Sequence, residues 1–177
     1  MDVIIKELQS IDVTTEYYSW FSQQDISDNI AWKPSDDITR GLDQLRDYVD
    51  LNLKSNNSVL FGIYVDTIHV GNLKYDNLTS ESSCCTVGIL IGNPSFRGKG
   101  LAAKSLIKGN KIIMRTYGIS IFELRVYSWN KHAISAYQKA GFNSVNAGYL
   151  IPHHPQGTIM RLELNQASNP PIPDSII

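Results

Sequence analysis

The stretch from Arg97 to Ala102 (Arg-Gly-Lys-Gly-Leu-Ala) combines glycine with positive charge, a few residues after an apolar run that ends at Ile91. Its two glycines would let the backbone approach a bulky anion closely. The pattern from Gly100 onward predicts a helix, and the first N–H groups of a helix have no partner inside it. With the helix dipole and the charges of Arg97 and Lys99, these N–H groups would bind an anion such as a phosphate.

Two common nucleotide-binding motifs do not fit this turn. A P-loop requires Gly-Lys-Ser/Thr, which does not follow here. A dinucleotide fingerprint can be aligned on Gly98, Gly100 and Ala103, but it requires an acidic residue about 20 positions later, at the end of the next strand. Glu123 lies inside the predicted strand rather than at its end.

A second block with chemical potential runs from Asn130 to Phe142. Asn130 is a suitable N-cap for a helix that Gly141 would end. Tyr137 would lie on the inner side of that helix. A tyrosine there is either a core aromatic or a proton donor, because a phenol can give its proton to a departing thiolate.

Together the two blocks, within residues 83–142, resemble the acetyl-CoA-binding motifs of the GNAT superfamily of N-acetyltransferases. Arg97-x-x-Gly100-x-Ala102 matches (Q/R)-x-x-G-x-(G/A), and residues 130–142 resemble N-x-x-(S/A)-x-x-x-Y-x-K-x-G-F. The chain is therefore identified as a member of this superfamily. Residues 18–21, 31–32 and 72–75 resemble the branch that includes ribosomal-protein N-terminal and amino-sugar acetyltransferases. The resemblance implies an α/β fold with a central mixed sheet and helices on both faces.

The resemblance also implies roles for individual residues. Acetyl-CoA would serve as acetyl donor, with its pantetheine arm along the preceding strand and its pyrophosphate on the glycine-rich turn. Asn130 would contact the pantetheine, and Tyr137 would protonate the departing thiolate. A backbone N–H near Leu90 would polarise the thioester carbonyl, and Lys99 and Lys131 would reach the outer phosphates. The expected cofactor-binding residues are Ile89, Leu90, Ile91, Arg97, Gly98, Lys99, Gly100, Leu101, Ala102 and Asn130.

The acceptor side is less defined by the sequence. Many GNAT enzymes place a glutamate base on the central strand, but residues 84–89 contain no carboxylate. The other candidate bases are Asp76, Glu81, His153 and His154. We expect direct transfer to a primary amine of a small molecule such as an amino sugar. The alternatives are a protein N-terminal acetyltransferase and a non-catalytic acyl-CoA-binding module.

The elements that must position these residues can be read from hydrophobic periodicity. Alternating or β-branched runs predict strands, and apolar residues at helical spacing predict helices. The expected strands are 3–8, 58–65, 67–75, 84–91, 121–127, 142–149 and 158–164. Helices are expected around 17–21, over 42–53, over 100–117 and from 130 to 141. The apolar run 84–91 predicts a central strand buried on both faces.

Composition limits the remaining possibilities. The 177 residues, 42% hydrophobic and 19% charged, indicate one globular domain over residues 1–167, followed by a proline-rich tail at 168–177. The adjacent Cys84 and Cys85 fit no disulfide or metal pattern, so we expect no metal and a cytoplasmic protein. No apolar run is long enough to cross a membrane. A net charge of −1 argues against nucleic acid, and the chain could be a monomer or a homodimer.

Overall fold

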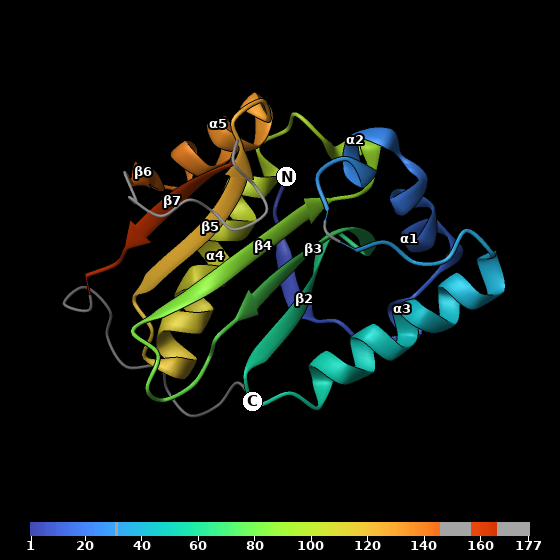
Figure 1. The fold of residues 1–177 in the computed structure, drawn as a ribbon, viewed down its shortest axis with the longest axis horizontal. Helices are drawn as coiled ribbons and strands as arrows, with labels where there is room; N and C mark the ends of the chain where they lie inside the picture. The colour runs from blue at the N-terminus through green and yellow to red at the C-terminus, as the bar shows by residue number, and fades with distance from the viewer. Residues whose placement is uncertain (31, 146–156, 166–177) are drawn as a thin grey trace.

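The computed structural model describes residues 1–30, 32–145 and 157–165 (Figure 1). The strands are β1 (Ile4–Glu7), β2 (Ser58–Val65), β3 (Ile68–Asp76), β4 (Cys84–Ile91), β5 (Ile121–Tyr127), β6 (Asn143–Val145) and β7 (Gly157–Glu163). The helices are α1 (Thr15–Ser19), α2 (Gln24–Ser27), α3 (Ile38–Leu53), α4 (Leu101–Tyr117) and α5 (Lys131–Lys139), with short 3-10 turns at Ser10–Asp12, Trp20–Ser22 and Pro94–Phe96.

The strands form one mixed sheet in the order β1-β2-β3-β4-β5-β7-β6. Neighbouring strands are antiparallel except β4 and β5, which run parallel and are connected by α4. This parallel pair is short. Its register joins only Cys84 to Ile121, Cys85 to Phe122 and Thr86 to Glu123. The remaining halves of both strands are therefore unpaired with each other.

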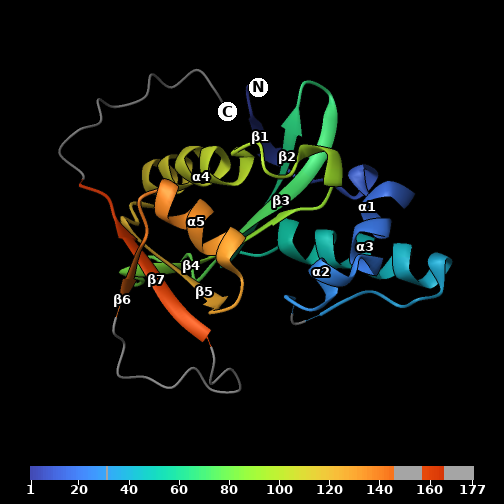
Figure 2. The same cartoon turned by 90° about the horizontal axis from the view of Figure 1, so that it is seen from above.

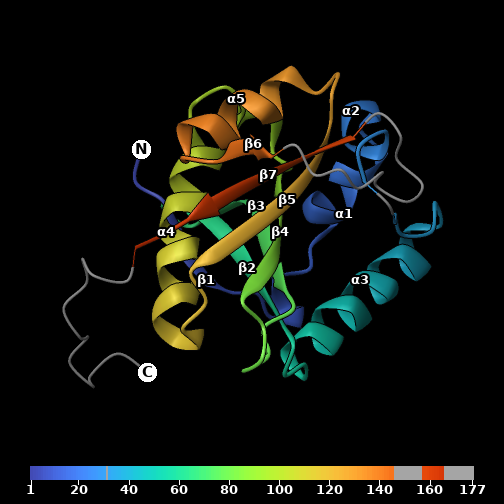
Figure 3. The same cartoon turned by 60° about the vertical axis from the view of Figure 1, so that its left-hand side comes forward.

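Helices lie on both sides of the sheet, as the sequence predicts (Figures 2 and 3). The larger core lies between the sheet and α4 with α5, and it includes Leu106, Ile113 and Phe122, each fully buried. A smaller core joins the other face of β2 to α1–α3 through Trp20, Leu45 and other apolar residues. The sheet supports a core on each side because the side chains of successive strand residues point to opposite faces of the sheet.

The prediction that β4 is buried on both faces is wrong. Cys85 and Val87 are buried, but Thr86 between them and Gly88 after them are exposed. In the described part of the chain, the smaller core lies over the other half of the sheet, toward β1 and β2. The nearly continuous apolar run of β4 suggested burial on both faces. Its exposed positions carry the small residues Thr86 and Gly88, so the alternation between the two faces was not visible in the sequence.

Most other predicted elements agree with the structure to within one or two residues at their described ends, but α3 begins at Ile38, four residues before the expected start at 42. Helix α2 was not predicted, because its four residues carry no periodicity. The first half of the expected strand 142–149 contains β6, whereas its second half and the tail at 168–177 lie outside the described residues. Within the described ranges, no helix is long and apolar enough to cross a membrane.

Candidate functional site

A cavity of about 920 Å³ opens where β4 and β5 stop pairing. The second halves of both strands line it, together with the turn before α4, the first part of α5 and the α2 region. The predicted site residues that line it are Ile89, Leu90, Ile91, Arg97, Gly98, Gly100, Leu101, Ala102, Asn130 and Tyr137. These predicted residues are up to 48 positions apart in the sequence, as Tyr137 and Ile89 are, and they meet in one space. Lys99 and Lys131, both expected to reach the outer phosphates, are not part of the lining. The ammonium of Lys99 lies 5.4 Å from the Phe96 ring centre.

The backbone of β4 can pair with a ligand along the side that β5 leaves free. The Gly92 N–H donates to Val70 O at 3.0 Å on the β3 side. Because backbone direction alternates, the peptide groups of Leu90 also point toward β3, and those of Ile89 and Ile91 point toward the cavity. The N–H groups that face the cavity are therefore those of Ile89 and Ile91, on either side of the expected Leu90.

The glycine-rich turn has the geometry of an anion site. Gly98 and Gly100 adopt φ angles of +70° and +75°, in the left-handed region that favours glycine. Gly100 is the N-cap of the 17-residue helix α4 and has no side chain to satisfy the first N–H groups. Within the described residues, no backbone carbonyl accepts from Leu101 or Ala102. Free N–H groups and the helix dipole thus face the cavity.

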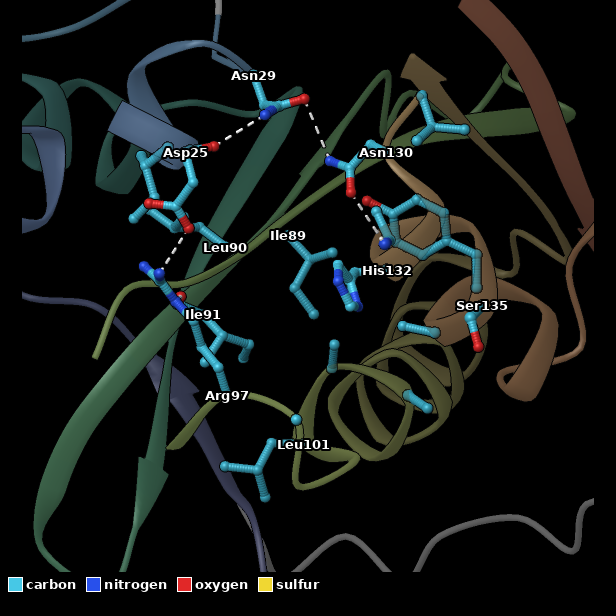
Figure 4. Close-up of a pocket in the computed structure, with 18 of the residues that line it drawn as sticks. Asp25, Asn29, Ile89, Leu90, Ile91, Arg97, Leu101, Asn130, His132 and Ser135 are labelled. Carbon is cyan, nitrogen blue, oxygen red and sulfur yellow. Dashed lines mark hydrogen bonds and ion pairs between the residues drawn. The ribbon is translucent and has the colours of Figure 1, made fainter. Parts of the chain in front are cut away.

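The side chain of Arg97 differs from the expectation that it adds charge to this anion site. Its Nε donates to Ile91 O at 2.9 Å, and one terminal nitrogen donates to Asp25 Oδ2 at 2.6 Å. The other terminal nitrogen donates to Gln23 Oε1 at 2.6 Å and to Gly92 O at 3.0 Å. The guanidinium therefore ties the end of β4 to the α2 region (Figure 4).

Asn130 caps α5 as predicted, because its Oδ1 accepts from the Ala133 N–H at 3.1 Å. Its Nδ2 donates to Asn29 Oδ1 at 3.2 Å, and Asn29 Nδ2 in turn donates to Asp25 O at 2.8 Å. Figure 4 shows this chain of contacts running from Asp25 through Asn29 to Asn130. The amide of Asn130 is thus occupied on both sides.

Tyr137 lies on the face of α5 that packs toward the larger core, and it also lines the cavity. Its ring lies 6.4 Å from that of Phe142. Within the described part of the chain its hydroxyl has no hydrogen-bond partner. Burial raises the pKa of Tyr137 to about 12, so the phenol stays protonated at physiological pH. It can therefore act as a donor toward a group in the cavity.

None of the bases named from the sequence lies in the described lining, but the imidazole of His132, which the sequence did not single out, does (Figure 4). Asp76 pairs with Lys74 at 2.9 Å, and Glu81 lies in the connection between β3 and β4. His153 and His154 lie outside the described residues. Burial raises the pKa of Cys84 to about 11, so this thiol is poorly suited to act as a nucleophile.

The cavity also contains charged residues that the sequence did not single out. Arg125 alternates with the buried Leu124 and Val126, so it faces the open side of the sheet. It is exposed, and the described residues offer it no ion pair or hydrogen bond. That alternation could have identified Arg125, whereas Asp25 required knowledge of the fold. Asp25 is the one acid of residues 1–50 in the described lining, and its carboxylate is paired with Arg97.

Comparison with known proteins agrees with this geometry. Residues 2–143 match the family model described as acetyltransferase (GNAT) domain. A search of curated proteins gives no match.

Solved structures share the fold at low sequence identity. An aminoglycoside acetyltransferase, AAC(6')-Ib, in complex with coenzyme A is 16% identical with a TM-score of 0.69, covering 92% of this chain and 95% of that one. A spermidine N-acetyltransferase from Vibrio cholerae in complex with CoA and spermine is 14% identical with a TM-score of 0.72, covering 92% and 94%. A domain from Methanocaldococcus jannaschii is 19% identical with a TM-score of 0.69, covering 92% and 99%.

The family match spans most of the chain, and it coincides with the cavity, the glycine-rich turn and the mixed sheet that the motifs predicted. Acetyl-CoA is the acetyl donor of this family, and the described residues contain no cluster of three or more ligands suited to a metal ion. The chain belongs to the GNAT family and is an acetyl-CoA-dependent N-acetyltransferase.

Proposed function

We propose that this enzyme transfers acetyl from acetyl-CoA directly to a primary amine of a small molecule, with an amino sugar on a nucleotide carrier as the leading acceptor. The observation that carries the proposal is the single cavity that joins the anion-binding turn, the free side of β4, Tyr137 and the open face of β5. One space thus offers a place for the cofactor and access for a second substrate.

The cofactor would enter this cavity in an extended form. Its pyrophosphate would accept hydrogen bonds from the N–H groups of Gly98 to Ala102 at the start of α4. Its pantetheine amides would pair with the peptide groups of Ile89 and Ile91, as an added strand pairs with a sheet edge. The Ile91 carbonyl is shared with Arg97, so Ile89 offers the freer pair of groups.

The chemical step then needs a polarised carbonyl and a proton donor. The neutral amine attacks the thioester carbon, and the carbonyl oxygen gains negative charge that the Ile89 N–H can stabilise. When the intermediate collapses, the C–S bond breaks and the sulfur takes a proton from Tyr137. The proton lost by the amine passes to water or to the imidazole of His132, which also lines the cavity, because the carboxylate of Asp25 is paired with Arg97. Solvent then returns a proton to Tyr137.

The charge of the cavity supports an acceptor that carries an anionic group. Asp25, the acid in the described lining, is neutralised by Arg97, whereas Arg125 is unpaired on the open face. A polycation would find no free carboxylate there, and a diphosphate-linked amino sugar would find a guanidinium suited to phosphate oxygens. Replacing Arg125 with glutamine should therefore weaken use of a nucleotide-linked amino sugar more than that of the free amino sugar.

The first test is acetyl-CoA binding measured by calorimetry, on the wild type and on Gly100→Trp. A side chain at φ +75° would strain the turn and fill it. Gly118→Trp is a matched control, because Gly118 has φ +72° and equally open surroundings at the other end of α4. Binding by the wild type and Gly118→Trp, but not by Gly100→Trp, supports the site; no binding by the wild type refutes the proposal.

The second test is an acceptor panel that separates the alternatives. It contains nucleotide-linked and free amino sugars, spermine, and peptides with free N-termini. Preferential acetylation of peptides would favour a protein N-terminal acetyltransferase. Binding of acetyl-CoA with no turnover on any amine would favour an acyl-CoA-binding module.

A further inference from the structure

The short segment Gln23–Asn29, which contains α2, lies along the cavity between the end of β4 and the start of α5. Its residues Asp25, Ile26 and Asn29 line the cavity. Ile26 is the buried residue of this four-residue helix, so apolar packing alone gives the segment little support. Its place depends on polar contacts with the two walls that it joins.

Arg97 supplies the contacts at the β4 wall. Four hydrogen bonds of 2.6 to 3.0 Å connect its guanidinium to Asp25 and Gln23 on the segment, and to the carbonyls of Ile91 and Gly92. Gln23 Nε2 also donates to Gly92 O at 3.1 Å. A planar fork of donors can satisfy four acceptors in different directions, which a lysine ammonium on its single nitrogen cannot match.

Asn130 supplies the contact at the α5 wall. Asn29 accepts from Asn130 and donates to the Asp25 carbonyl, so the segment is held at both ends by residues next to the cofactor site. The partners are 72 positions apart for Arg97 with Asp25, and 101 for Asn130 with Asn29.

We propose that Arg97 is a positioning residue that fixes the segment Gln23–Asn29 as the acceptor-side wall, and that its guanidinium does not hold the cofactor's phosphates. The inference rests on the proposed function for the identity of the cavity. In this arrangement the backbone of the cofactor motif binds acetyl-CoA. The side chain of Arg97, the first residue of the motif, instead shapes the neighbouring acceptor subsite.

The test compares Arg97→Lys and Asp25→Asn with the wild type by two independent measurements. Amide hydrogen exchange over residues 23–29 reports on the segment, and calorimetry with acetyl-CoA reports on the phosphate site. Asp28→Asn is the matched control, because Asp28 lies on the same segment and accepts only a local hydrogen bond from Gln24. Thermal unfolding checks that each variant is folded.

Arg97→Lys and Asp25→Asn should speed exchange over residues 23–29 by about tenfold, the scale of one charged hydrogen bond. The Kd for acetyl-CoA should change by less than about threefold, and Asp28→Asn should leave both values unchanged. For the amine that the wild type acetylates fastest in the panel, the acceptor KM should rise while the acetyl-CoA KM stays constant.

The opposite pattern would overturn the inference. A phosphate-binding Arg97 would lose acetyl-CoA affinity by tenfold or more in Arg97→Lys, with unchanged exchange over residues 23–29. Unchanged exchange in both variants would also refute it. If the wild type failed to bind acetyl-CoA, the proposed function would fail, but hydrogen exchange would still report on the tie between Arg97 and the segment.

Discussion

Replacing Tyr137 with phenylalanine removes a single hydroxyl from the wall of the cavity. That hydroxyl has no hydrogen-bond partner among the described residues, and the ring packs beside Phe142 in a way that phenylalanine can keep. The substitution therefore removes no hydrogen bond within the described part of the chain. We expect the free energy of unfolding to change by less than about 0.5 kcal/mol, as for other substitutions that break no buried contact.

The catalytic effect should be much larger. General acid catalysis contributes about 10²- to 10⁴-fold to a rate. Burial raises the pKa of Tyr137 to about 12, well above the value of about 8.5 for an unperturbed cysteine thiol. Full transfer of the proton to a thiolate is thus uphill, and we expect the lower end of the range. A loss of about 10²-fold in kcat corresponds to about 2.7 kcal/mol.

The assay follows release of the CoA thiol with a chromogenic thiol reagent, at saturating acetyl-CoA and acceptor. Tyr117→Phe is the control, because Tyr117 also carries a phenol but lies at the far end of α4, outside the cavity lining. Since the phenol of Tyr137 remains neutral up to about pH 11, its ionisation should not lower kcat between pH 8 and 10. A Tyr137→Phe variant as fast as wild type would refute the donor role, and equal losses in both variants would show that the effect is not specific to the site.

Three further predictions concern residues outside the transfer step. Burial lowers the pKa of His69 in the folded state, so the unfolded state binds a proton on this side chain more readily. The free energy of unfolding should therefore be fully retained above about pH 6.5, and it should fall as the pH drops toward the lower pKa of the folded state. Urea unfolding at pH 7.5 and 5.5 should show this drop, and an equal drop in His69→Gln would contradict it. Tyr75→Phe should cost about 1–3 kcal/mol in urea unfolding, because the buried Tyr75 hydroxyl donates to Asn110 Oδ1 at 2.7 Å; no change would show that this bond adds nothing. Cys84→Ser should keep the wild-type kcat and give intersecting lines in double-reciprocal plots of initial rate, since the raised pKa of Cys84 leaves its thiol protonated. Loss of activity in this variant would point to an acyl-cysteine route.

The order of elements could be predicted because most of them carry strong local patterns. Strands β2, β4 and β5 begin and end where their apolar or β-branched runs do. Helix α4 is capped by Gly100 and Gly118, both in left-handed conformations. Helix α2 could not be predicted in this way. Its four residues are held by contacts with distant parts of the chain, which no local pattern records.

The candidate site likewise has a cofactor half, which local sequence patterns predict, and an acceptor half, which depends on contacts between distant parts of the chain. The cofactor half lies within residues 89–137, where the glycine-rich turn and the N-cap Asn130 have local sequence rules. The side chain of Arg97 escaped prediction because its partners Asp25 and Gln23 lie more than 70 positions away. Its positive charge was visible in the sequence, but the carboxylate that neutralises it was not.

This division has a consequence for how acceptor specificity can change in such a chain. In the proposed site, the groups that would bind the cofactor are mostly backbone groups of Ile89 and the turn, which side-chain substitution barely alters. The acceptor wall consists of side chains on a short segment, and Arg97 and Asn130 hold it in place. Substitutions between Gln23 and Asn29 can therefore reshape the acceptor subsite while the acetyl-CoA site stays intact. For that reason the motifs identify the donor, whereas the acceptor must be found by experiment.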